Sequence, residues 1–135
     1  METPYVSSTQ LWILFAIHIG IQGYADIGEF IWSDHVYASA KSRSGIGLKI
    51  SATLSKMEKI GLVYSCWNND YVRLSYYLTK SGIDQLHTAL QEHFFYNDIA
   101  MRRKKLQETY KKGLLLESDY PKCISGLAYL ESHLS

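Results

Sequence analysis

The sequence predicts a mostly α-helical α+β fold with one small β-ribbon and further helices after it. A helix-patterned segment, residues 54–60, runs directly into Gly61, a residue that commonly ends helices. Two strand-like runs follow and end at Thr79, whose hydroxyl can cap a new helix. Helix, glycine, ribbon and helix in this order define the fold class that we expect.

Length and composition indicate one ordered domain with extensions. The 135 residues are 47% hydrophobic, 13% aromatic and 20% charged, which excludes a mainly disordered chain. Cys66 and Cys123 lack the spacing of metal ligands or of a disulfide framework, so we expect a reducing, cytoplasmic location. The apolar run 11–21 is shorter than the ~20 residues that span a bilayer, and no Lys or Arg precedes it as in a signal peptide. We expect it to form a buried first helix, and we expect no membrane association.

The first half of the chain shows two short helical patterns. Hydroxyl residues before the apolar run can cap a helix over about residues 8–20. Apolar residues at helical spacing predict a second helix over residues 26–33. Residues 34–44 leave two alternatives open, because either a neighbouring helix extends into them or they form an inserted loop.

A third helix is predicted over about residues 45–59. Ile46, Ile50, Leu54 and Met57 form one apolar stripe at helical spacing. The remaining arc of the helix is small, hydroxylated and basic, and consists of Leu48, Lys49, Ser51, Ala52, Ser55, Lys56 and Lys59. Such a surface can enter the major groove of DNA, which is roughly 12 Å wide. An ordinary solvated helix face would have the same composition, so this alternative stays open.

Two strands are predicted over residues 62–67 and 71–78. The turn between them, Asn68-Asn69-Asp70, contains residues that tolerate turn conformations. In the second run apolar and polar-tipped side chains alternate, as expected for a half-buried ribbon.

The last part of the chain is predicted to be helical. The helix that begins after Thr79 has an expected interior face of Ile83, Leu86, Leu90 and Phe94. We expect it to continue toward Tyr110 with a bend at Asn97-Asp98, and a final helix to span residues 123–134. The apolar faces of these helices exceed what a small core can cover, which favours a homodimer. The predicted organisation is therefore a first unit over residues 1–80 and a helical dimerisation extension over residues 81–135.

Charge is distributed unevenly, although the net charge is only +1. Residues 1–40 contain no Lys or Arg and four acids, whereas residues 41–60 contain five bases and one acid, Glu58. The second segment would attract phosphates and the first would repel them.

Three motifs resemble the winged helix-turn-helix transcription regulators, most closely the PadR-like and MarR-like group. They are Gly23-Tyr24, Leu54-x-x-Met57-Glu58-x-x-Gly61-Leu62-Val63 and Arg73-x-x-Tyr76-Tyr77-Leu78-Thr79-x-x-Gly82. The resemblance covers residues 8 to about 90, roughly two thirds of the chain. It implies that the third helix reads the major groove, that the ribbon (about residues 62–78) is the wing, and that C-terminal helices form a dimer.

Motifs for catalysis or for a cofactor are missing from the sequence. Gly45-x-Gly47 lacks the third glycine and the preceding strand of a dinucleotide site. The five histidines form no HExxH motif and have no cysteine at ligand spacing, and no nucleophile elbow is present. We therefore expect no enzymatic activity, no metal and no cofactor.

The leading hypothesis is a dimeric, sequence-specific regulator of transcription that binds double-stranded DNA. The expected DNA-binding residues are Lys49, Ser51, Ser55 and Lys56 on the reading face, Arg43, Ser44 and Lys59 at phosphates, and Asn68, Asn69 and Arg73 in the wing. Two half-sites one helical turn apart would form the operator.

The sequence leaves two alternatives open. The ribbon is poor in bases, so the domain could be a protein-docking module in which Trp67, Tyr71 and Tyr77 form an exposed anchor cluster. A small-molecule effector could also bind in an aromatic pocket between the wing domain and the long helix.

Overall fold

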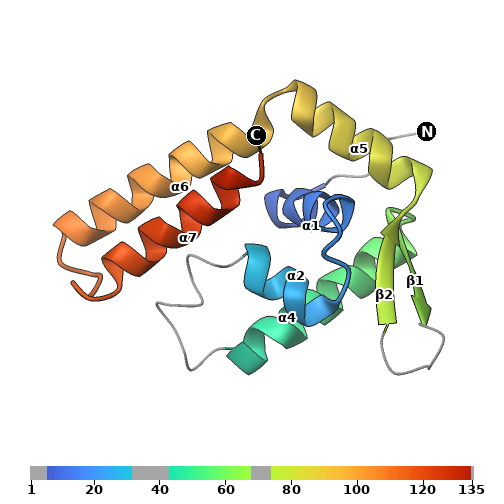
Figure 1. Ribbon diagram of the computed structural model, residues 1–135, viewed down its shortest axis with the longest axis horizontal. Coiled ribbons are helices and arrows are strands. Elements are labelled where there is room, and N and C mark those ends of the chain that lie inside the picture. Colours follow the sequence, from blue (N-terminus) through green and yellow to red (C-terminus); the bar gives the residue numbers. More distant parts are fainter. Residues whose placement is uncertain (1–5, 32–42, 68–73, 135) are drawn as a thin grey trace.

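The computed structural model describes residues 6–31, 43–67 and 74–134 (Figure 1). Within helix α4, side chains are described from Lys49 onward. The elements in chain order are α1 (Ser8–His18), α2 (Tyr24–Ile31), α4 (Arg43–Lys59), β1 (Val63–Trp67), β2 (Leu74–Leu78), α5 (Lys80–Gln91), α6 (Phe94–Lys111) and α7 (Tyr120–Ser132). Three helices, an antiparallel hairpin and three further helices confirm the predicted mostly helical class with a small β-ribbon.

Helix α1 is the centre of the core. Ser7 caps it in a capping box, in which the Gln10 amide donates to Ser7 Oγ at 3.2 Å and the Ser7 amide donates to Gln10 Oε1 at 3.0 Å. Every residue from Trp12 to Ile17 is buried, because α1 packs between α2 and α5 and also touches β2 (Figure 1). A helix that is apolar on all sides can be stable only in such a position. The predicted buried first helix is confirmed, and it ends at His18 rather than near residue 20.

Helix α4 packs against α2 and leads into the ribbon. Ile50, Leu54 and Met57 are fully buried, which confirms the predicted apolar stripe for the described residues. Gly61 has a φ of +83°, so it provides the left-handed residue with which helices commonly end. The Leu62 amide then donates to the Met57 carbonyl at 2.9 Å and fixes the chain where it leaves the helix.

Strands β1 and β2 form a two-stranded antiparallel ribbon in which Val63 pairs with Leu78, and Trp67 pairs with Leu74. Because side chains alternate between faces, Val63 and Tyr76 point to the inner face, where they are buried, and Tyr64 and Tyr77 point to the outer face. The Thr79 amide donates to the Leu62 carbonyl at 3.1 Å and closes the base of the ribbon.

The break between α5 and α6 lies earlier than predicted. The sequence pattern predicts one helix with a bend at Asn97-Asp98, but α5 ends at Gln91 and α6 begins at Phe94. His93 adopts the left-handed conformation with φ 57° and ψ 31°, which no helix can continue through. Asn97-Asp98 does not interrupt α6. The carboxylate of Asp98 is bound there by the side chains of Trp12 and Arg102.

The predicted interior face of α5 is only partly correct. Leu86 is fully buried and Phe94 is half-buried, whereas Ile83 and Leu90 are 39% and 40% exposed. The buried residues of α5, which packs on α1 and β2, are Gly82, Leu86 and Ala89. Ile83 and Leu90 lie outside this packed face.

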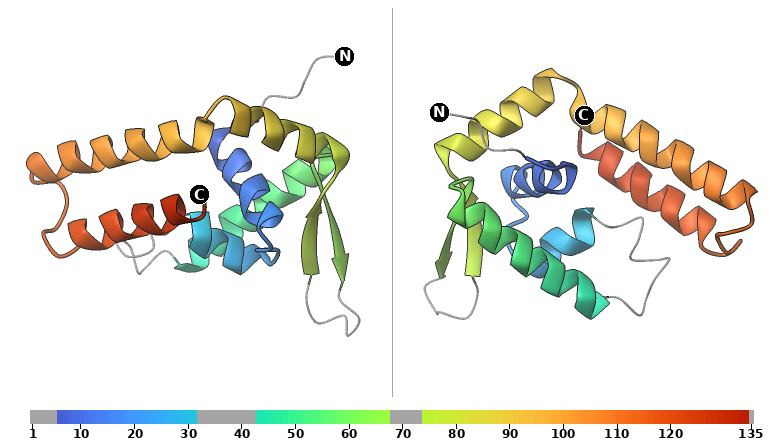
Figure 2. Two further views of the ribbon diagram at one scale, coloured as in Figure 1. Left: turned by 45° about the horizontal axis from the view of Figure 1, so that its top comes forward. Right: turned by 180° about the vertical axis from the view of Figure 1, so that it is seen from behind.

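Helices α6 and α7 form an antiparallel hairpin that extends away from α4 and the ribbon (Figures 1 and 2). The final helix begins at Tyr120, three residues earlier than predicted, with Pro121 in its first turn where a missing amide hydrogen costs nothing. Leu127 and Leu130 of α7 and Phe95 and Ile99 of α6 belong to the same core as α1.

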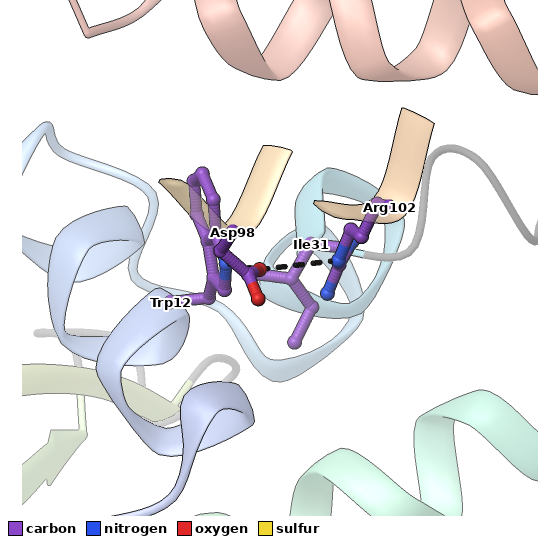
Figure 3. A network of polar contacts seen from close by, with 4 residues as sticks. All are labelled: Trp12, Ile31, Asp98 and Arg102. Carbon is purple, nitrogen blue, oxygen red and sulfur yellow. Dashed lines mark hydrogen bonds and ion pairs between the residues drawn. The ribbon is translucent and has the colours of Figure 1, made fainter. Parts of the chain in front are cut away.

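A polar clasp joins the hairpin to α1 and α2 (Figure 3). Trp12 Nε1 donates to Asp98 Oδ2 at 2.7 Å, and the same oxygen lies 3.2 Å from Arg102 Nε. The Arg102 guanidinium also donates to the Ile31 carbonyl at the end of α2, at 3.3 Å. We call this group the clasp; it consists of Trp12, Asp98, Arg102 and the Ile31 carbonyl.

Among the described helices, none combines the length and the apolar character that crossing a lipid bilayer requires.

Candidate nucleic-acid interface

The surface of α4 opposite its buried stripe is exposed and basic. We call this surface the outer arc. Its members are all exposed, and they are Lys49, Ser51, Ala52, Ser55, Lys56 and Lys59. Helix α4 lies on the side of the molecule that faces the reader in the rear view, where no other helix or strand crosses in front of it (Figure 2, right). The surface predicted from helical spacing therefore exists and is accessible in this chain.

The residues of the outer arc are ordered around the helix. Ser51 lies on the side of the ribbon, since it shares a cavity with residues of β1 and β2. At about 100° per residue, Lys49 and Lys56 lie roughly 140–160° further around the helix. The arc therefore has a hydroxylated edge toward the ribbon and a cationic edge away from it.

The lysines of the outer arc have no compensating partner in the described structure. Within residues 6–31, 43–67 and 74–134, no carboxylate forms an ion pair with Lys49, Lys56 or Lys59. The nearby acid, Glu58, accepts a hydrogen bond from Ser65 Oγ at 3.1 Å, so its carboxylate is directed to the ribbon. The charge of the three lysines remains available to an anionic partner.

The other predicted DNA-binding residues cannot be placed on this surface. Arg43 and Ser44 lie in the first turn of α4, but their side chains fall outside the described part of the chain. Asn68, Asn69 and Arg73 also lie outside the described residues. The structure brings together Lys49, Ser51, Ser55, Lys56 and Lys59 on one surface, and a role in DNA binding stays a prediction for all ten residues.

The predicted aromatic anchor cluster of the ribbon does not form as proposed. The strand register puts Trp67 on the inner face and Tyr77 on the outer face, so the two rings cannot belong to one surface. Tyr77 instead stacks on Tyr64, its cross-strand partner, with ring centroids 5.4 Å apart. Tyr71 lies outside the described residues.

A cavity of about 560 Å³ separates the inner face of the ribbon from the first turn of α2 and from Ser51. Tyr76 forms part of its wall and is only 6% exposed. Burial raises the pKa of the Tyr76 hydroxyl above its usual value, and the negative charge of Glu58 adds to the effect. The phenol therefore stays protonated at neutral pH. The pocket expected from the sequence lies between the wing domain and the long helix. The sequence therefore does not predict this cavity.

Comparisons with known proteins give no further assignment: no family model, no curated protein and no solved structure matches the chain.

Proposed function

We propose that this protein is a dimeric, winged-helix regulator of transcription that binds double-stranded DNA sequence-specifically through α4. The observation that carries the proposal is the outer arc, which is exposed, cationic and without ion-pair partners among the described residues. Helix α4 would lie in the major groove, and the β1–β2 ribbon would be the wing beside it.

The size and chemistry of the outer arc suit a groove. Ser51, Ala52 and Ser55 are small, so the helix can approach the base edges closely, and the serine hydroxyls can both donate and accept hydrogen bonds. Lys49, Lys56 and Lys59 can reach phosphates on either side of the groove.

Exposed apolar residues after residue 80 support dimerisation. Ile83 and Leu90 on α5 are about two-fifths exposed, and Met101, Leu114 and Leu116 are 66%, 76% and 69% exposed. Pairing α5 and α6 with their copies across a two-fold axis would bury Ile83, Leu90 and Met101 and would place two copies of α4 for two half-sites. In sedimentation velocity at micromolar concentration we expect twice the protomer mass of 15.5 kDa; a species of 15.5 kDa would contradict the dimer.

The DNA proposal predicts a strong effect of removing two lysines of the outer arc. Lys49→Ala combined with Lys56→Ala should weaken binding by roughly tenfold for each lysine at about 0.1 M salt, because each phosphate contact releases bound counterions. The slope of log affinity against log salt should fall by about one for each lysine–phosphate pair that the substitutions remove. Fluorescence anisotropy with duplexes selected from a random pool measures both quantities.

A matched control is available on α6. Lys104 and Lys111 are exposed and have the same seven-residue spacing as Lys49 and Lys56, so Lys104→Ala with Lys111→Ala removes equal charge from a different surface. Equal binding losses in the two double variants would show only a general charge effect. An unchanged affinity of the α4 variant would refute the assignment of the outer arc.

Protein docking remains the second candidate, because the described strands of the ribbon carry no charged residue. A gel shift with mixed duplex DNA at low salt separates the two functions. Absence of binding at micromolar protein would favour docking.

A further inference from the structure

The cavity between the ribbon, α2 and α4 has the size of a small-molecule site. Its volume of about 560 Å³ lies within the ~300–1,000 Å³ that is typical of ligand pockets. The residues that line it include Tyr24, Asp26, Ser51, Trp67, Leu74 and Tyr76.

Trp67 is unusually exposed for its position. It lies on the inner face of the ribbon, where Val63 and Tyr76 are 1% and 6% exposed, but Trp67 itself is 57% exposed. Trp67 lines the cavity together with Tyr24, a residue that is 49% exposed. Two accessible aromatic rings in one pocket can hold a cation against their electron-rich faces, and tryptophan is the strongest such partner.

Asp26 gives the cavity a negative charge. Its Oδ2 lies 3.4 Å from the point that a Cβ on Gly23 would occupy, so the carboxylate folds back over the start of α2. It is the only charged side chain among the described residues that line the cavity, and no hydrogen-bond or ion-pair partner for it is found within the described part of the chain. An anionic ligand would be repelled here, whereas a cation would be attracted.

Hydrogen bonds hold the walls of the cavity in place. The Tyr76 amide donates to the Gln22 carbonyl at 3.0 Å, which fixes β2 against the segment that leads into α2. Ser65 of β1 is bound to Glu58 of α4. These bonds hold the ribbon against α2 and α4 without a ligand.

We propose that this cavity binds a small organic cation, an ammonium or guanidinium group carried on an aromatic or branched aliphatic body. The carboxylate of Asp26 would pair with the charged group, while Trp67, Tyr24 and Leu74 would cover the body. This inference does not depend on DNA binding. If the protein also binds DNA, Ser51 links the ligand cavity to the DNA-binding surface, because it belongs to both the cavity wall and the outer arc.

Three probes with the same phenylethyl body test the charge requirement: 2-phenylethylammonium, 2-phenylethanol and 3-phenylpropanoate. We expect the cation to bind at roughly millimolar concentration, the alcohol more weakly and the anion not at all. Two-dimensional ¹H–¹⁵N NMR of the full chain follows the indole resonances of its three tryptophans. The Trp67 resonance, assigned from its loss in Trp67→Phe, should shift with saturation, whereas that of the buried, hydrogen-bonded Trp12 should not.

Asp26→Asn should weaken binding of 2-phenylethylammonium about fivefold, the upper range for a solvent-accessible ion pair. Asp84→Asn provides the matched control, since Asp84 is exposed on α5 and does not line the cavity. The Trp12 resonance reports whether each variant is folded. Equal binding of the ammonium and the alcohol, an unchanged affinity in Asp26→Asn, or no shift of the Trp67 resonance would each overturn the proposal.

Discussion

Gly82→Ala should destabilise the protein by about 3 kcal/mol, although alanine is the better helix former by about 1 kcal/mol. Gly82 lies in the first turn of α5 and is buried. A Cβ at this position would stand 2.2 Å from the Leu62 carbonyl oxygen and 3.4 Å from a methyl carbon of Leu14. The first distance is far shorter than van der Waals contact, so either the backbone of Leu62 or helix α5 must move.

Neither partner in this contact can move without further loss. The Leu62 carbonyl accepts from the Thr79 amide at 3.1 Å, and the Leu62 amide donates to Met57 at 2.9 Å, so the backbone of Leu62 is held on both sides. Gly82 is held by its own amide, which donates to Thr79 Oγ1 at 3.1 Å as part of the helix cap. A methyl group must therefore push α5 away from the base of the ribbon and from α1, which breaks the cap or opens the core.

Urea denaturation followed by circular dichroism measures this loss as a lower transition midpoint. Ser81→Ala is the matched control, because Ser81 is exposed in the same turn of α5 and its replacement should change stability by less than about 0.5 kcal/mol. If Gly82→Ala were as stable as the original chain, the close approach of α5 to Leu62 would be wrong.

Local hydrogen bonds explain which helix ends were predictable from the sequence. The caps at Ser7 and Thr79 bond amides three positions away, and Gly61 ends the helix directly before it, so each has the predicted capping or stop role. The break at His93 was missed because a left-handed residue other than glycine has no compositional signal. The role of Asp98 was also missed, since its partner Trp12 lies 86 positions away in the sequence.

The two candidate sites also differ in whether residues near in the sequence or distant from one another determine them. The outer arc follows from the helical spacing of Ile50, Leu54 and Met57 alone, because one buried stripe determines which residues remain outside. The cavity could not be predicted, since it depends on how far the ribbon stands from α2. That separation is set by the bond between Tyr76 and Gln22, two residues that no sequence pattern connects.

Asp98→Ala should cost about 3 kcal/mol of stability, because it removes the central acceptor of the clasp. Trp12 is fully buried, so its indole N–H would lose the hydrogen bond that it now makes at 2.7 Å. Arg102, whose side chain is 21% exposed and whose guanidinium carbon lies 5.9 Å from the centroid of the Trp12 ring, would lose its ion pair with Asp98. Asp98→Asn should cost less, since an amide oxygen can still accept from the indole.

A double-mutant cycle with Trp12→Phe separates the hydrogen bond from general effects of the substitutions. Both residues belong to one network, so we expect their losses to be non-additive by about 1 kcal/mol or more. Glu108→Ala is the control for charge removal on α6, since Glu108 is exposed on the same helix. Because Arg102 also binds the Ile31 carbonyl, Asp98→Ala should loosen the docking of α6 on α2 and speed hydrogen exchange in the first turns of α6. A loss no larger than that of Glu108→Ala, with additive behaviour in the cycle, would mean that the clasp does not hold the hairpin to the core.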